Sequence, residues 1–396
     1  MDTEYSRGAA WSGSDKTADQ INYVTNLSPA DLAEIKAALE YYMGFEGNAY
    51  EVDAAKFPLP TLGPRLEEIA KNLHEGTGFS LLRGFDTKNY SDEDNLIIFL
   101  GLGSYIGSQR GAQNKSRVMI SHITDAKEWQ HVPSEKRHGI HTNSALPFHN
   151  DMGCEILTLL YRQLAASGGV TSLASAAAIY DDLLKQPDIL QTLTAADWPV
   201  QLSVKQQRFK GMPLLAYHEG HVIISADPGR LGLHPTTAEQ PSEGSKLTEA
   251  QLKSLEVLNE LAEKHALAIP AQAGDILFIN NLGVLHKRDS YVDGDGDGAA
   301  GSIGEAMKDD DDVKAGDDKH QVTDKTKRRW LMRLWLRNDA LSWEIPKPMK
   351  LPWEAAYGKG VGRLITPKYE PSTQPDYKEP RYTSGTAAWL IEDDED

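Results

Sequence analysis

Apolar residues change their spacing along the chain near Val118. Before that point they recur at helical intervals, and three segments predict helices, beginning at Ser28, after Pro64 and at Ser91. Ser91 followed by Asp94 indicates a capping box, in which each side chain bonds the other residue's backbone amide. We expect this third helix to extend to about residue 102. One strand, over residues 79–85, is predicted among these helices.

After Val118 the apolar residues form short runs that are typical of strands, separated by turns. Predicted strands cover residues 156–161, 170–175, 214–217, 222–224, 274–279 and 328–337. Helices are predicted over residues 175–185 and after Thr248, where Gln251 completes a capping box. No strand–helix repeat is present. The pattern therefore favours an α+β fold with a mainly β core and helices packed outside it.

Two segments lack apolar periodicity. Residues 1–27 predict an N-terminal arm that is either ordered by contact or loose, and residues 293–322 predict a disordered acidic insertion rich in Gly and Asp. The remaining chain, residues 28–396, is expected to form a single domain. Its C-terminal sixty residues, which hold several prolines, predict an irregular wrap over the core.

The net charge of −17 argues against a nucleic-acid-binding protein, because such proteins need a basic surface. Residues 293–319 carry ten acidic residues against three lysines, and residues 392–396 are all acidic, so the acidity says little about an active site. One cysteine, Cys154, excludes an internal disulfide. No apolar run is long enough to cross a membrane, and the polar N-terminus lacks a signal-peptide pattern. We expect a cytoplasmic protein and leave a homo-oligomer open.

The strand predicted at residues 329–337 has two unlike faces. One face is wholly apolar, while the other carries Arg329, Arg333 and Arg337 together with Leu331 and Trp335. Arginines on a solvent-facing strand would be ordinary surface residues, and this interpretation suits Arg337 at the strand end. The apolar neighbours of Arg329 and Arg333 instead indicate that these two side chains are partly buried. A buried guanidinium needs an anionic partner such as a carboxylate or sulfonate.

His149 and Asp151 form an H-x-D tripeptide that allows two interpretations. The neighbouring Pro147, Asn150 and Gly153 favour a simple turn. On an extended strand, however, residues i and i+2 point to the same side and could bind one metal. His286 follows a predicted apolar strand 135 positions after Asp151. Two histidines and one carboxylate constitute the facial triad of non-haem Fe(II) oxygenases, which leaves positions open for O2 and a co-substrate.

Together these motifs resemble the TauD/TfdA-like family of Fe(II)/2-oxoglutarate-dependent dioxygenases. The resemblance extends from about residue 79 to about residue 358. It rests on Phe148-His149-Asn150-Asp151, on residues 167–171, on Gly274-Asp275 through His286, and on Arg328-Arg329 through Arg333. It implies a double-stranded β-helix, or jelly roll, with flanking helices. It also implies oxidation of an unactivated C–H bond, by hydroxylation, desaturation or cyclisation, with release of succinate and CO2.

The resemblance also implies roles for individual residues. His149, Asp151 and His286 would bind Fe(II), while Thr171 and Arg329 would bind the co-substrate 2-oxoglutarate beside O2. Arg333 would bind an acidic group of a small anionic substrate, such as an amino acid or another carboxylate.

Some features depart from the family or suggest alternatives. His286 and Arg329 are separated by 42 residues, because of the acidic insertion, and Ala145 stands where the taurine enzymes have an asparagine. A sulfonate dioxygenase remains an alternative, as does a catalytically silent jelly roll that only binds metal. The EF-hand-like residues 293–298 lack the glutamate at position twelve of the loop. Cys154, His138 and His141 are expected to be packing or loop residues.

Overall fold

The computed structural model describes most of the chain. The described residues are 9–14, 21–45, 49–114, 116–126, 131, 133, 137–203, 208–232, 246–294, 328–358 and 366–373. The expected acidic insertion and the EF-hand-like motif therefore lie outside the described residues, apart from residues 293 and 294. Within the described part of the chain, no helix has both the length and the apolar composition needed to span a membrane.

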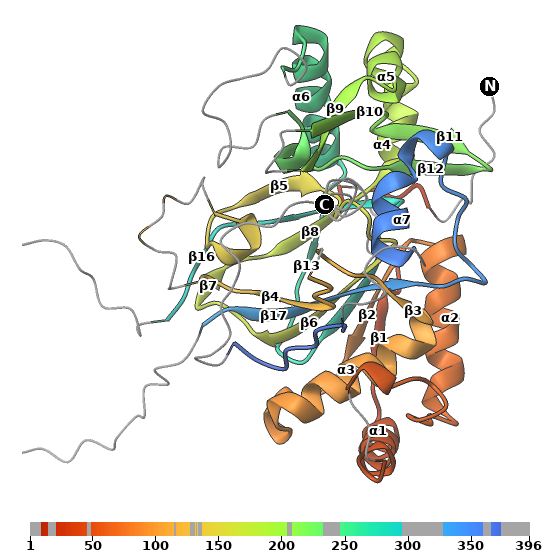
Figure 1. Cartoon of the computed structure of the whole chain (residues 1–396), viewed down its shortest axis with the longest axis vertical. Coiled ribbons are helices and arrows are strands. Elements are labelled where there is room, and N and C mark those ends of the chain that lie inside the picture. The colour runs from red at the N-terminus through yellow and green to blue at the C-terminus, as the bar shows by residue number, and fades with distance from the viewer. Residues whose placement is uncertain are drawn as a thin grey trace, which may run out of the picture.

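Two β-sheets form the centre of the molecule (Figure 1). The larger sheet has seven strands in the order β1-β2-β14-β6-β17-β3, with β4 also paired to β17. Its strands are β1 (Val24–Asn26), β2 (Phe79–Arg83), β3 (Gln109–Arg110), β4 (Ile120–Ile123), β6 (Ile156–Gln163), β14 (Ile276–Asn280) and β17 (Trp330–Arg337). The smaller sheet has the order β13-β8-β15-β5 and consists of β5 (Leu146–His149), β8 (Thr171–Ser175), β13 (Leu267–Ile269) and β15 (Val284–Arg288).

In the described part of the chain, three further strand pairs and seven α-helices surround these sheets. The pairs are β7 (Ser167–Gly168) with β16 (Tyr291–Val292), β9 (Trp198–Ser203) with β10 (Arg208–Met212), and β11 (Leu215–His218) with β12 (His221–Ile224). The helices are α1 (Pro29–Met43), α2 (Leu62–Glu75), α3 (Asp92–Ile106), α4 (Ala176–Leu183), α5 (Pro187–Thr194), α6 (Glu249–Lys264) and α7 (Leu351–Tyr357).

The elements form four layers. Figure 1 shows α1, α2 and α3 at one end of the molecule and α4, α5 and α6 at the other, with the two sheets between them. One apolar cluster joins α1–α3 to the larger sheet, a second fills the space between the sheets, and a third joins the smaller sheet to α4–α6. This arrangement confirms the expected α+β jelly roll with flanking helices.

The predicted helix starts agree with the structure at their caps. Ser28, Ser91 and Thr248 each accept a bond from the backbone amide three residues later, and each forms a complete capping box. Helix α3 continues to Ile106, beyond the expected end at residue 102, because its last turn is buried in the core. Elements that were not expected include β4, β13, the β9–β10 hairpin, and α7 within the C-terminal segment.

Strand β17 has the two faces that the sequence predicts. Met332, Leu334 and Leu336 pack toward α1–α3, while Leu331 and Trp335 lie in the cluster between the sheets. The arginines on this second face therefore point into the jelly roll, and Arg329 and Arg333 are 2% and 7% exposed. The solvent-facing interpretation of these two arginines is thus wrong.

The described part of the N-terminal arm lies on the domain. Trp11 is buried and packs against Phe79 at 5.0 Å between ring centroids. Strand β1 pairs in parallel with β2, so residues 24–26 form the edge of the larger sheet. These contacts favour an arm that is ordered by contact with the domain over a loose one.

Candidate active site

The smaller sheet brings His149 and His286 together. His149 ends β5, His286 lies on β15, and the two residues are direct partners in the antiparallel register. Their ring centroids are 4.2 Å apart. The Nε2 atoms of His149 and His286 lie 3.8 and 3.9 Å from Oδ1 of Asp151. The three potential ligand atoms thus lie within 4.8 Å of one another, as a shared metal ion requires.

A turn brings Asp151 into this cluster. Strand β5 ends at His149, and residues 150–153 turn the chain, with Gly153 at φ +92° and the Cys154 amide donating to the Asp151 carbonyl. As the H-x-D spacing predicts, the two side chains reach one point, although the strand itself ends at His149 and a turn follows at residues 152 and 153. The turn-forming neighbours and the potential metal ligands are parts of the same feature.

Two buried asparagines fix the turn. The Asp151 amide donates to Oδ1 of Asn281 at 3.0 Å, and Nδ2 of Asn281 donates to the carbonyls of Asp151 and Cys154. Nδ2 of Asn150 donates in turn to the carbonyls of Asn281 and Val284. Neither asparagine is predicted as a site residue from the sequence. Their positions could have indicated this role, because Asn150 lies inside the H-x-D motif and Asn281 lies just before the strand of His286.

Hydrogen bonds and burial prepare the three side chains for a metal. Nδ1 of His149 lies 2.8 Å from the Pro147 carbonyl and donates to it, so Nε2 is the ring nitrogen that faces Asp151. Burial, with a smaller contribution from His149, lowers the pKa of His286 to about 3 and keeps that ring neutral. Neutral imidazole is the form that binds metals.

Asp151 keeps its negative charge although it is buried. Burial alone would raise its pKa, but the nearby Arg333 guanidinium and the two histidines outweigh that effect, and the pKa of Asp151 lies below its ordinary value. Oδ2 of Asp151 accepts from Nη1 of Arg333 at 2.9 Å and from Nε1 of Trp335 at 3.1 Å. These donors occupy Oδ2, so Oδ1 is the oxygen that faces the histidines.

Arg329 and Thr171 lie together at one end of the space between the sheets, linked through Tyr161. The Tyr161 hydroxyl donates to Oγ1 of Thr171 at 2.9 Å. Burial raises the pKa of Tyr161, and the nearby Arg329 guanidinium partly opposes this shift. Nη1 of Arg329 is buried without a hydrogen-bond partner in the described structure. Arg329 can approach because Gly169 has no side chain: a Cβ there would lie 2.9 Å from Nε of Arg329. A carboxylate ligand could accept the hydrogen bond that Nη1 of Arg329 leaves unmade.

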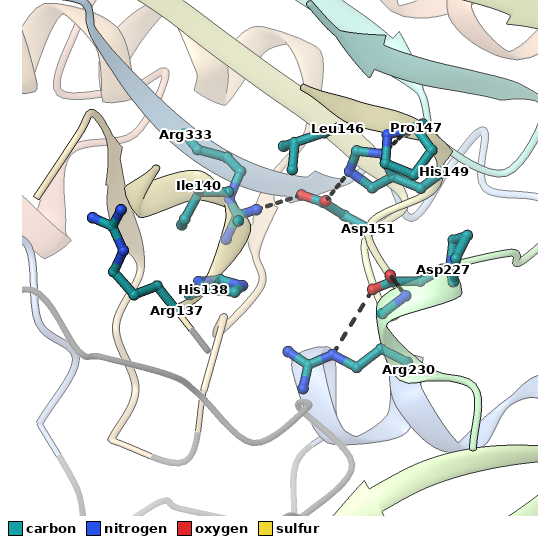
Figure 2. A pocket seen from close by; sticks show the side chains of 13 residues that line it. Arg137, His138, Ile140, Leu146, Pro147, His149, Asp151, Asp227, Arg230 and Arg333 are labelled. Carbon is teal, nitrogen blue, oxygen red and sulfur yellow. Dashed lines mark hydrogen bonds and ion pairs between the residues drawn. The ribbon is translucent and has the colours of Figure 1, made fainter. Parts of the chain in front are cut away.

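A cavity of about 170 Å³ opens beside the potential metal ligands. Figure 2 shows Arg333 and Asp151 at its inner side, Arg137 and His138 on one wall, and Asp227 and Arg230 across from them. Nε of Arg230 is 3.8 Å from Oδ2 of Asp227. Burial raises the pKa of Asp227, and Arg230 partly opposes this shift. Arg137, Asp227 and Arg230 are not predicted as site residues from the sequence.

The other candidate residues take different places. His138 lines the cavity and His141 is buried near it, whereas His218 and His221 lie on the β11–β12 hairpin. Cys154 is buried, and burial raises the pKa of its thiol well above the ordinary range. It does not line the cavity and is a packing residue, as expected.

Comparisons with known proteins agree with this geometry. The family described as "Taurine catabolism dioxygenase TauD, TfdA family" matches residues 19–299. The chain is 33% identical over 346 residues to the taurine hydroxylase-like protein SAT17 of Stachybotrys chartarum, covering 85% of this chain and 80% of that protein. It is 26% identical over 289 residues to FR-33289 synthase of Streptomyces rubellomurinus, covering 70% and 80% respectively.

Solved structures of non-haem iron oxygenases share the fold. One is asparagine oxygenase in complex with Fe(II), 3-hydroxyasparagine and succinate, with a TM-score of 0.56 and 14% identity over 80% of this chain and 94% of that one. Another is OrfP in complex with Fe, succinate and (3S)-hydroxy-L-Arg, with a TM-score of 0.53 and 13% identity over the same shares. The chain described here belongs to the TauD/TfdA family and is an Fe(II)/2-oxoglutarate-dependent dioxygenase.

Proposed function

We propose that this enzyme oxidises an unactivated C–H bond of a small anionic substrate, with an amino acid as the favoured class. His149, Asp151 and His286 would hold the iron, and Thr171 and Arg329 would hold 2-oxoglutarate. When bound, the iron and 2-oxoglutarate supply an oxidant from O2 and release succinate and CO2. The residues of the chain position the substrate bond, exclude water and balance the buried charges.

The observation that carries the amino-acid proposal is the mixed charge of the cavity. Asp227 and Arg137 both line the cavity and lie on opposite sides of it (Figure 2). A carboxylate attracts an α-ammonium group, and a guanidinium attracts an α-carboxylate. Arg137 also pairs with Asp125 at 3.3 Å, which holds its side chain in place. A zwitterionic substrate would match both Asp227 and Arg137, whereas a simple anion would match Arg137 alone.

Substrates of the structural relatives support the same class. Asparagine oxygenase was solved with a hydroxylated asparagine, and OrfP with a hydroxylated arginine. The second candidate is a sulfonate dioxygenase, favoured by the similarity to a taurine hydroxylase-like protein. Ala145, which replaces the asparagine expected of taurine enzymes, weighs against taurine itself.

A succinate assay tests this proposal. Purified protein with Fe(II), ascorbate, O2 and 2-oxoglutarate is offered a panel of amino acids, dicarboxylates and sulfonates. We expect succinate to rise above the substrate-free rate with at least one amino acid. Stimulation by taurine alone would replace the proposal with the sulfonate alternative. No stimulation by any compound, together with no Fe(II)-dependent binding of 2-oxoglutarate, would contradict both.

Asp227 provides a matched variant for the substrate class. Asp227→Asn keeps the size of the side chain but removes its charge, so we expect KM for an amino acid to rise about 10-fold, as for the loss of one charge-assisted bond. The affinity for 2-oxoglutarate should not change, because Asp227 lies on the substrate wall. An unchanged KM for the amino acid would remove Asp227 from substrate recognition.

A further inference from the structure

Strand β15 continues past His286 to a second inward-facing residue, Arg288. Residues two apart on a strand share a face, so Arg288 points into the jelly roll as His286 does. Arg288 is 5% exposed and is the register partner of Thr171 on the neighbouring strand β8. The sequence Lys287-Arg288-Asp289 resembles an ordinary charged surface segment, which is why its period alone did not identify a site residue.

Arg288 and Arg329 form a buried pair of like charges. The Tyr291 ring lies beside both guanidiniums, with centroid distances of 5.1 Å to Cζ of Arg288 and 5.2 Å to Cζ of Arg329. Within the described residues, neither arginine forms an ion pair with a carboxylate. Burial and the charge of Arg329 lower the pKa of Arg288 to about 10, and burial lowers that of Arg329. Such a pair is costly unless an anion joins it.

Four of the buried polar atoms that lack a hydrogen-bond partner in the described structure belong to this pair and to the Tyr291 ring beside it. They are Nε and Nη1 of Arg288, Nη1 of Arg329 and the hydroxyl of Tyr291. All belong to side chains at most 5% exposed. Buried donors of this kind are rare in folded proteins unless a ligand or water completes them. Their chemistry is that of a carboxylate site with more donors than one arginine supplies.

The third nitrogen of Arg288 is used elsewhere. Nη2 donates to the carbonyl of Thr142 at 2.9 Å and to that of Gly139 at 3.5 Å, and it also contacts the Ser144 carbonyl. Gly139 begins the short 3₁₀ helix Gly139–His141, and Gly139 and Ile140 line the substrate cavity. One guanidinium thus contacts the wall of the substrate cavity with one edge and faces the Arg329 site with the other.

We propose that Arg288 is a second arginine for the distal carboxylate of 2-oxoglutarate, acting with Arg329, and that it couples this carboxylate to the Gly139–His141 wall of the substrate cavity. The inference rests on the assignment of Arg329 to 2-oxoglutarate. It explains why two cations are buried together at this position. It also predicts that the wall is best ordered when the co-substrate is bound, so that the substrate binds to a prepared cavity.

Isothermal titration with two ligands tests the proposal. The Fe(II)-loaded protein is titrated without O2, first with 2-oxoglutarate and then with 2-oxopentanoate, which has a methyl group in place of the distal carboxylate. We expect Arg288→Gln to weaken 2-oxoglutarate binding about 10-fold or more, as for one lost charge-assisted interaction, and to change 2-oxopentanoate binding less than about twofold. Arg288→Lys, which keeps the charge without the fork, should give an intermediate loss.

The ratio of the two affinities within each variant is the internal control for folding. An equal loss for both ligands would show that Arg288 only braces the Gly139–His141 wall, and no loss for either would show that it contributes nothing; both results overturn the proposal. The lysine variant decides the matter if the glutamine variant does not fold. If the wild-type protein itself binds both ligands equally, the assignment of Arg329 fails first, and the inference falls with it.

Discussion

Arg329 and Arg333 lie four residues apart on the same face of one strand segment, and both are buried, yet their surroundings differ. Arg333 donates from Nη1 to Asp151 and from Nε to Oε1 of Gln113, both at 2.9 Å. The Arg329 guanidinium has no carboxylate partner among the described residues: Asp293 accepts only from the Arg329 backbone amide, and the Arg288 guanidinium lies beside the same Tyr291 ring. The fold therefore supplies the anion for one arginine and leaves the other for a ligand.

This difference separates two uses of a buried cation. The charge of Arg333 keeps Asp151 ionised and holds its Oδ2, so that Oδ1 faces the histidines. The charge of Arg329 is available to a small anion. Sequence alone assigns both arginines to ligands, because a period-2 pattern shows which face they share but not what lies across from them.

The largest expected effect follows removal of the carboxylate that pairs with Arg333. Asp151→Ala takes away a metal ligand and also leaves Arg333 buried without its counter-charge. We expect iron binding and turnover to fall below detection, and the free energy of unfolding to fall by about 3 kcal/mol, as for breaking a buried ion pair. Metal analysis and denaturant unfolding measure the two effects.

The double variant Asp151→Ala with Arg333→Met is the control for this prediction. It should recover part of the lost stability, because no unpaired charge remains, without recovering iron. Wild-type iron content in Asp151→Ala would contradict the assignment of Asp151 as a ligand.

A smaller effect is expected when Gly169, which lies against Arg329, is replaced by alanine. Gly169 has φ +68°, and a Cβ there would lie 2.9 Å from Nε of Arg329 and 3.2 Å from Cβ of Tyr291. Gly169→Ala should therefore displace Arg329 and weaken 2-oxoglutarate binding about 10-fold, with a modest loss of stability. Titration calorimetry on the iron-loaded protein measures the affinity.

Gly168 is the matched control for that substitution. Its φ is +74°, but a Cβ there would meet the Ser290 carbonyl and not an arginine. Gly168→Ala should destabilise the β7–β16 pair while the folded protein retains its affinity for 2-oxoglutarate. Loss of affinity in Gly168→Ala as large as in Gly169→Ala would attribute the effect to the turn instead of to Arg329.

The smallest effect concerns a buried histidine that stays neutral. It packs against the face of β17 opposite to the one that carries Arg329 and Arg333. His122 on β4 is the register partner of Met332 and is fully buried. Its Nδ1 accepts from Nε1 of Trp330 at 3.0 Å and its Nε2 donates to the Glu370 carbonyl at 3.1 Å, so the ring is neutral. Burial, only partly opposed by the bond to Glu370, lowers the pKa of His122 to about 4.

The depressed pKa sets the direction of the pH effect. Between pH 6.5 and 4 the unfolded chain protonates this histidine while the folded protein does not, so stability is present above that window and is lost as the pH falls through it. His122→Gln should lack this dependence, so the difference between the wild-type and variant free energies of unfolding should change by about 1.4 kcal/mol per pH unit in this window. Parallel curves over this range would show that His122 is not buried as a neutral ring.

Local sequence predicted much of the fold and the metal cluster. Capping boxes at Ser28, Ser91 and Thr248 mark helix starts because they depend on residues only three positions apart. The two faces of β17 follow from its period. His149, Asp151 and His286 could be chosen together because their residue types and order match a known ligand set. The geometry of Asp151 was not predictable, because the turn is held by Asn281, 130 residues away.

Contacts between distant segments account for what the sequence did not show. The Arg333–Asp151 pair joins residues 182 positions apart. Arg288 resembles a surface residue until β8, Tyr291 and the carbonyls of residues 139–144 surround it. Asp227 and Arg230 reach the cavity from the 3₁₀ segment Pro228–Arg230, which no periodic pattern predicts.

The contrast between the two arginines of β17 is tested most directly by the affinity of 2-oxoglutarate for two variants, measured side by side by titration of the iron-loaded protein without O2. We expect Arg329→Gln to bind 2-oxoglutarate roughly 10- to 100-fold more weakly, because it loses charge-assisted bonds to the distal carboxylate. Arg333→Gln should bind it within about threefold of the wild type, while binding iron about 10-fold more weakly and losing affinity for an acidic substrate. Equal losses of 2-oxoglutarate affinity in the two variants would contradict the division of roles between Arg329 and Arg333.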